Sequence, residues 1–134
     1  MQGWPQAIST ADKVAYHKLL LAVGFETIDI GSFVSPRAIP QMADTGKVLQ
    51  ALVDEGLLDG AGRPRLLTIV ANVRGAKEAG STEVVDDMGF PYSISETFQM
   101  RNTGTGQTEA RTKLKEIAEI CDRSEKRLVT YLSM

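Results

Sequence analysis

Chemically useful side chains gather around a stiff loop that follows an apolar segment near residue 30. Residues 27–30, Thr-Ile-Asp-Ile, have the pattern of a buried strand, and residues 31–44, Gly-Ser-Phe-Val-Ser-Pro-Arg-Ala-Ile-Pro-Gln-Met-Ala-Asp, follow directly. The two prolines each fix φ and remove a backbone donor, so the strand cannot continue through this loop. Small and polar residues that leave the carboxyl end of a strand are typical ligand contacts in α/β proteins. The loop is therefore a candidate region for contact with a ligand.

The elements that must position this loop alternate between helix and strand along the chain. Apolar residues at helical spacing predict helices over residues 9–23, 44–55, 72–79 and 108–123. Short apolar runs predict strands over residues 25–30, 65–70, 83–85 and 127–132. The polar stretch 88–107 is expected to form a long loop. Repeated helix-then-strand units favour a parallel α/β sheet, and their periodicity alone leaves an open sheet and part of a barrel as alternatives.

Length and composition bound the class of protein. The chain has 134 residues, of which 43% are hydrophobic and 24% charged, as expected for one globular domain. A net charge of −2 gives no basic field, so nucleic acid is not expected as a partner. No apolar run is long enough to span a membrane, and the N-terminus lacks the features of a secretory signal. The single cysteine excludes an internal disulfide and predicts a cytoplasmic location.

Residues 31–44 closely resemble the loop after the second barrel strand in the 3-hydroxy-3-methylglutaryl-CoA lyase family. That family has (Ser/Thr)-Ser-Phe-Val-Ser-Pro-(Lys/Arg)-x-x-Pro-Gln-Met-x-Asp at this place, and so long an ordered match is far more specific than a lone glycine motif. Met1-Gln2 is similar to the end of the family signature Arg-Asp-x-(Leu/Met)-Gln. Three further segments resemble the family in the same order along the chain. Residues 9–24 are similar to its first helix, residues 66–75 to its third strand, and residues 95–102 to the segment after its fourth strand.

The resemblance implies an α/β fold that is part of a (β/α)8 TIM barrel, with about four parallel strands alternating with helices. Residues 1–134 would form one partial barrel domain of the pyruvate carboxyltransferase-like type. Because a complete barrel needs roughly 250 residues, we expect the chain to be an N-terminal-half fragment. The family's Arg-Asp pair would lie just before Met1, and its His-x-His motif would lie well after Met134.

The activity implied by the resemblance is a retro-Claisen cleavage of 3-hydroxy-3-methylglutaryl-CoA to acetyl-CoA and acetoacetate. A divalent cation, Mg²⁺ or Mn²⁺, would stabilise the negative charge that develops on the substrate oxygens. The family binds this cation through the aspartate of the Arg-Asp pair, two histidines and an asparagine, and none of these matches a residue here. We therefore expect the chain alone to be inactive. The expected partners are a CoA thioester and further copies of the protein, with no nucleic acid and no membrane.

Four residues match positions on the substrate side of the family's site. The resemblance gives Asp29 a catalytic role at the end of the second strand, where many members have the longer glutamate. It gives Gln2 a contact with the polar groups of the substrate, Ser32 a contact with the acyl group, and Asn102 a contact with the CoA arm. Simpler roles stay open: Gln2 as part of a disordered terminus, Asp29 as an acid satisfied by loop amides, Ser32 as a loop cap, and Asn102 as a turn residue.

Other candidate residues have simpler explanations. Asp86-Asp87 could form a metal pair, but the solvated start of a loop is favoured. Gly104-Thr105-Gly106 lacks the lysine and the preceding strand of a P-loop. His17 is the single histidine and is expected in the first helix, on the outside of the barrel. Cys121 is expected on the last helix, so neither residue is a match for a family site residue.

Two alternatives to the lyase stay open. One is a related Claisen-type synthase of the isopropylmalate or homocitrate class, against which the Phe-Val-Ser-Pro loop argues. The other is a non-catalytic half-barrel, which would act as a binding module or be a remnant. An incomplete barrel exposes a sheet edge and uncovered core, so this second alternative predicts dimers or aggregates.

Overall fold

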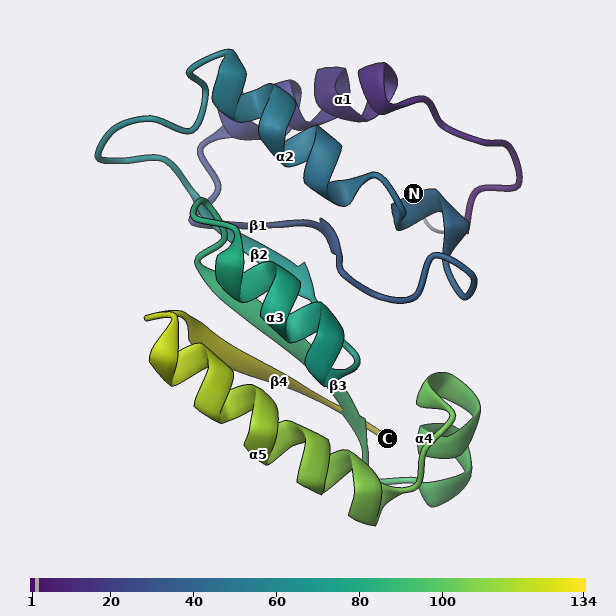
Figure 1. Ribbon diagram of the computed structural model, residues 1–134. Helices are drawn as coiled ribbons and strands as arrows, with labels where there is room; N and C mark the ends of the chain where they lie inside the picture. Colours follow the sequence, from purple (N-terminus) through teal and green to yellow (C-terminus); the bar gives the residue numbers. More distant parts are fainter. Residues whose placement is uncertain (2) are drawn as a thin grey trace.

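Four strands form one parallel sheet in the order β1-β2-β3-β4 (Figure 1). The computed structural model describes residue 1 and residues 3–134. Its elements are α1 Thr10–Val23, β1 Thr27–Ser32, a 3-10 helix Pro40–Met42, α2 Thr45–Asp54, β2 Arg65–Ile69, α3 Val73–Ser81, β3 Asp87–Ser93, α4 Glu96–Thr103, α5 Gln107–Arg123 and β4 Arg127–Ser133. Alternating helices and parallel strands are those of a partial TIM barrel, which confirms the expected fold class.

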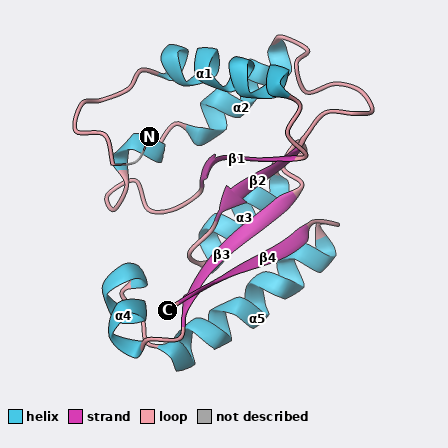
Figure 2. Cartoon of the chain, turned by 180° about the vertical axis from the view of Figure 1, so that it is seen from behind, coloured by secondary structure: helices cyan, strands magenta, loops and turns pink. Residues whose placement is uncertain are grey.

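The helices pack on one side of the sheet, and Figure 2 turns the opposite side toward the viewer. Between the sheet and α1, α2, α3 and α5 lies a continuous apolar core. Its most deeply buried side chains include Leu49, Leu52, Leu66, Val70, Val85, Met88, Phe90 and Ile117. The short helix α4 instead lies near the carboxyl ends of β3 and β4 (Figure 1).

Local sequence signals explain where the first helices begin and end. Ser9 precedes α1, and its hydroxyl oxygen accepts a hydrogen bond from the Asp12 amide at 3.1 Å. Gly24 ends α1 with φ +86°, a left-handed conformation that costs glycine little. Asn72 caps α3 in the same way, accepting from the Gly75 amide at 2.9 Å. These boundaries agree with the sequence prediction.

The prediction for residues 83–107 is wrong in two places. The strand expected at residues 83–85 is found later, as β3, and part of the expected loop is the helix α4. Glycine and proline are disfavoured inside strands, so Gly89 and Pro91 argued against a strand at the position of β3. However, Ile69, Leu67 and Tyr131 approach to within 3.1 Å of the place where a Gly89 side chain would begin, so packing favours glycine there.

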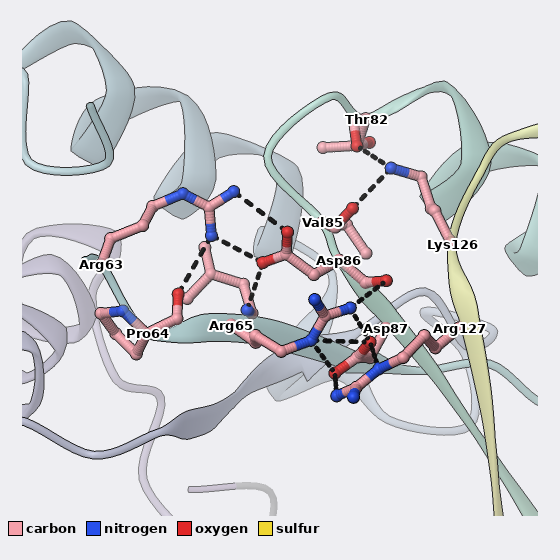
Figure 3. Close-up of polar contacts among 10 residues, drawn as sticks. Arg63, Pro64, Arg65, Thr82, Val85, Asp86, Asp87, Lys126 and Arg127 are labelled. Carbon is pink, nitrogen blue, oxygen red and sulfur yellow. Dashed lines mark hydrogen bonds and ion pairs between the residues drawn. The ribbon is translucent and has the colours of Figure 1, made fainter. Parts of the chain in front are cut away.

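The amino ends of the strands hold a dense network of ion pairs (Figure 3). Asp87 is fully buried, and its carboxylate accepts hydrogen bonds from Arg65 at 2.5 Å and from Arg127 at 2.8 Å. Asp86 pairs with Arg63 at 2.6 Å and also accepts from the Leu66 amide at 2.7 Å. Neither aspartate lies at the solvated start of a loop, so that prediction is wrong. Both hold neighbouring strands and connections together.

No helix in the described part of the chain is both long enough and apolar enough to cross a membrane.

Candidate functional site

A cavity of about 480 Å³ lies at the carboxyl ends of β1, β2 and β3. Three of the four predicted site residues, Asp29, Ser32 and Asn102, line it together. The fourth, Gln2, lies outside the described residues. The rest of the lining is mainly apolar and comes from α1, the loop after β1 and the strand ends: Tyr16, Leu20, Ile30, Val34, Ile39, Met42, Ile69, Ala71 and Pro91. An apolar hollow with a few convergent polar groups is typical of a small-molecule site.

Asp29 lies in the middle of β1 and reaches both the cavity and solvent. Loss of hydration beside the sheet raises the pKa of its carboxyl above the ordinary value, although the Gly31 amide and the chain's amino terminus oppose this shift. No lysine or arginine forms an ion pair with Asp29 within the described residues. Its carboxyl group therefore holds a proton more readily than a paired surface aspartate does.

Ser32 ends β1 and is only 6% exposed. Its amide donates to the Thr45 hydroxyl at 3.2 Å, and Thr45 in turn donates to the Met42 carbonyl at 2.9 Å. The Ser32 hydroxyl itself has no hydrogen-bond partner among the residues that the structure describes. It therefore does not cap its loop, and a buried hydroxyl without a partner is costly unless a ligand or water satisfies it.

Asn102 lies on the last turn of α4 and is exposed beside the cavity. The buried Gln99 fixes this helix, because its side-chain oxygen accepts from the Ser93 amide at 2.6 Å and its nitrogen donates to Thr103 at 2.8 Å. Asn102 is therefore a helical residue and not part of a turn. The predicted CoA contact thus lines the cavity from a helix, on a stretch that the sequence predicted to be a loop.

Buried polar contacts hold the loop after β1 against α1. Lys13 is 4% exposed, and its ammonium group donates to the Gln41 carbonyl at 2.5 Å and to Asp44 at 2.6 Å. Thr10 also donates to Asp44, at 2.7 Å. Partial burial of Asp44 acts to raise the pKa of its carboxyl group. The hydrogen bonds from Lys13 and Thr10 outweigh this effect, and the pKa is lowered. Gln41 extends the restraint to the N-terminal segment by accepting from the Ile8 amide and donating to the carbonyls of Trp4 and Gln6.

His17 is a cavity residue that sequence analysis placed outside the site. It lies in α1, as predicted, but it is 2% exposed and lines the same cavity as Ser32, which was not predicted. Burial lowers the pKa of its imidazole and favours the neutral form. Its Nδ1 is buried and has no hydrogen-bond partner among the described residues. Only its spacing from Val14 in the helix could have indicated that it faces inward.

The residues in hand do not fit a metal site on their own. Within residues 1 and 3–134, no group of three or more histidine, cysteine, aspartate or glutamate side chains is placed to hold an ion. Asp29 is the cavity's one carboxylate in this part of the chain, and it has no second acidic ligand beside it. We therefore derive no step of a reaction through a metal from these residues.

Known proteins share both the sequence and the fold. No protein-family model matches the chain. It is 30% identical over 134 residues to the 3-hydroxy-3-isohexenylglutaryl-CoA/hydroxy-methylglutaryl-CoA lyase of Pseudomonas aeruginosa, a match that covers 99% of this chain and 42% of that protein. The HMG-CoA lyase structure from Brucella melitensis matches with a TM-score of 0.85 and 26% identity, over 98% of this chain and 44% of that one.

A third match carries a bound ligand. The HMG-CoA lyase of Acinetobacter baumannii, solved in complex with coenzyme A and 3-methylmalate, has a TM-score of 0.85 and 23% identity over 98% of this chain and 40% of that one. The chain thus spans about two-fifths of the length of the proteins it matches. Over that length, the chain is homologous to the hydroxymethylglutaryl-CoA lyases and corresponds to part of their TIM barrel.

Proposed function

We propose that this chain supplies the substrate-binding side of a hydroxymethylglutaryl-CoA lyase-like enzyme, a carbon–carbon lyase that acts on CoA thioesters. The observation that carries the proposal is the shared cavity, where Asp29, Ser32 and Asn102 meet at the carboxyl ends of parallel strands. Active sites of barrel enzymes lie at that end. The homology to lyases that cleave 3-hydroxy-3-methylglutaryl-CoA supports this substrate class.

Each residue has a role that its geometry allows. The Ser32 hydroxyl, buried and without a partner among the described residues, would donate to an oxygen of the acyl group. The Asn102 amide, at the exposed rim, would contact the CoA arm. Asp29, whose carboxyl has a raised pKa, would hold or accept a proton beside the acyl group during cleavage. Gln2, outside the described residues, is proposed as a further contact with the substrate's polar groups.

We include a divalent cation, Mg²⁺ or Mn²⁺, in this proposal without assigning it a ligand in this chain. Its ligands would come from residues that this chain does not contain, since the described residues hold no metal-binding group. When bound, the cation would stabilise negative charge on substrate oxygens. A cytoplasmic location, predicted from the single cysteine, also stays a proposal.

Calorimetric binding tests the proposal with the chain as it is. We expect 3-hydroxy-3-methylglutaryl-CoA to bind more tightly than free CoA, and Ser32→Ala to weaken thioester binding about tenfold, the loss of one hydrogen bond of about 1.4 kcal/mol. Ser81→Ala, on the exposed end of α3, is the matched control and should bind like the wild type. Equal affinity for free CoA and the thioester, in wild type and Ser32→Ala alike, would contradict the proposal.

A product assay separates the three alternatives. In the full-length gene product with Mg²⁺ present, acetoacetate release from the thioester would show a lyase, whereas CoA release from acetyl-CoA and a 2-oxo acid would show a synthase. Thioester binding without either reaction would indicate a binding module. The lyase is favoured over the synthase, because the proteins similar to this chain are lyases.

A further inference from the structure

Asp29 and Ser32 enter the same cavity, although their spacing in a regular strand would place them on opposite faces. Side chains along a strand alternate between its two faces, so residues three positions apart point in opposite directions. In β1, however, the pairing register with β2 skips Ile30. Asp29 lies opposite Leu67, and Ser32 lies opposite Ile69, only two residues further along β2. Ile30 is thus the extra residue of a β-bulge, which puts Asp29 and Ser32 on one face of the sheet.

The opposite face of β1, after the bulge, meets the start of α2. Gly31 pairs with Thr68 and faces the helices, whereas Ser32 and Ile69 both line the cavity. A side chain at Gly31 would begin 2.8 Å from the hydroxyl oxygen of Thr45 and 2.9 Å from its methyl carbon. Only glycine therefore fits between the bulge and this threonine.

Thr45 is the first residue of α2 and is 5% exposed. Its hydroxyl oxygen accepts a hydrogen bond from the Ser32 amide at 3.2 Å, and the hydroxyl donates to the Met42 carbonyl at 2.9 Å. One side chain thereby ties the residue that follows the bulge both to the loop and to a helix. Thr45 is not among the described residues that line the cavity, so it acts on a ligand only through β1.

We propose that Thr45 is a positioning residue, which holds the bulge of β1 so that the Asp29 carboxyl and the Ser32 hydroxyl both face the acyl group of a CoA thioester. This inference rests on the proposed function, because it takes the cavity to be the thioester site. Without the bulge, the regular alternation of a strand would turn the Ser32 hydroxyl toward the helices. The acyl group would then lose a contact, while the CoA arm would keep Asn102 at the rim of the cavity.

Calorimetric binding to Thr45→Val tests the role, since valine keeps the shape of threonine and removes only the hydroxyl group. We expect the affinity for 3-hydroxy-3-methylglutaryl-CoA to fall about tenfold and the affinity for free CoA to stay unchanged. Thr45→Ser keeps the hydroxyl and should restore thioester binding. Thr68→Val is the matched control, because the Thr68 hydroxyl is equally buried and has no hydrogen-bond partner among the residues described. It should leave both affinities unchanged.

Gly31→Ala disturbs the same contact from the strand. Its new methyl group would collide with Thr45, so this variant should also weaken thioester binding without weakening free CoA. Gly46→Ala, one residue after Thr45, has nothing within 4 Å of its new methyl group and should bind like the wild type. Equal binding by Gly31→Ala and Gly46→Ala would contradict a role for the bulge.

Hydrogen exchange of the Ser32 amide, measured by NMR without ligand, reports on the bulge directly. This amide should exchange about tenfold faster in Thr45→Val than in the wild type and in Thr45→Ser, while the amides of β3 keep their rates. Faster exchange throughout β3 would show that Thr45 supports the whole fold, and would overturn a role confined to the bulge.

The two measurements separate failure of this inference from failure of the proposed function. If the wild type prefers the thioester, but Thr45→Val keeps either the wild-type thioester affinity or the wild-type exchange of Ser32, the positioning role is overturned and the proposed function stands. If the wild type does not distinguish the thioester from free CoA, the proposed function is contradicted and the positioning role falls with it.

Discussion

The amino-end ion-pair network and the cavity differ in how their aspartates are bound. At the amino end, Asp86 and Asp87 are each bound by arginine, and Asp87 is fully buried between two of them (Figure 3). Asp29, in the middle of β1, has no ion-pair partner among the described residues, and the Ser32 hydroxyl at the carboxyl end of that strand makes no hydrogen bond to them. The network satisfies its carboxylates from within the chain, whereas the cavity leaves the Asp29 carboxyl and the Ser32 hydroxyl available to a ligand.

The pKa directions follow from this difference. Burial alone would raise the pKa of Asp87, but Arg127 and Arg65 hold it well below its ordinary value. Loss of hydration raises the pKa of Asp29, which has no such cation to oppose it among the described residues. The amino end of a barrel serves stability and its carboxyl end serves chemistry. In this chain the contrast shows in the partners of individual carboxylates.

The largest expected effect is that of Asp87→Ala, which removes the shared partner of Arg65 and Arg127. We expect the free energy of unfolding to fall by about 3 kcal/mol, the lower part of the range for breaking a buried pair, because both guanidinium groups reach solvent. Urea denaturation measures the loss. Asp122→Ala, at an exposed position on α5, is the control and should change stability by less than about 0.5 kcal/mol. Equal stability of the two variants would show that the amino-end network is not a stabilising feature.

Alanine substitutions at two helical glycines test how tightly α3 packs against the loop that follows β1. A methyl group at Gly75 in α3 would lie 2.1 Å from the Phe33 carbonyl oxygen, in the loop that follows Ser32. Gly75→Ala should therefore cost about 2 kcal/mol through overpacking. It should also weaken thioester binding, because the loop must move.

Gly46→Ala in α2 is the matched control, since nothing lies within 4 Å of its new methyl group. This change should stabilise the protein by about 0.5 kcal/mol, because alanine restricts the unfolded chain. Thermal denaturation of both variants gives the comparison. If Gly75→Ala were as stable as Gly46→Ala, the close approach of α3 to the loop would not matter.

The carboxyl-end loop could be predicted from sequence because its constraints are local. Two prolines and a run of small residues fix where β1 stops, and Asp29 and Ser32, which the matched motif proposed as site residues, both line one cavity. The caps of α1 and α3 were equally visible, since a capping side chain lies within three residues of the amide it binds.

The features that sequence analysis missed depend on distant residues. Asp87 is a buried strand residue only because Arg65 and Arg127, 22 and 40 positions away, bind it. β3 forms despite Gly89 and Pro91 because neighbouring strands pack around them. His17 faces the cavity because of how α1 lies on the sheet. Tertiary contacts of this kind override local preference, and a single sequence does not display them.

The smallest expected effect, and the most specific, is that of Asp29→Asn on the pH dependence of stability. The folded-state pKa of Asp29 is raised. Its contribution to the free energy of unfolding is therefore complete below the unfolded-state pKa of about 4, and is lost as the pH rises through the folded-state pKa. The amide that replaces the carboxyl in this variant does not titrate. The variant should therefore gain stability relative to the wild type between pH 3 and pH 7, by roughly 0.5 kcal/mol or less at this solvent-exposed position.

Asp87 should show the opposite sign, since its lowered pKa adds stability above pH about 4 that disappears as pH falls. Urea denaturation of wild type, Asp29→Asn and Asp87→Asn at pH 3, 5 and 7 measures both trends. With rising pH, the stability of Asp29→Asn relative to wild type should increase, while that of Asp87→Asn should decrease. If both differences moved in the same direction, the fold would not shift the pKa values of Asp29 and Asp87 in opposite directions, and the raised pKa that supports a catalytic role for Asp29 would be contradicted.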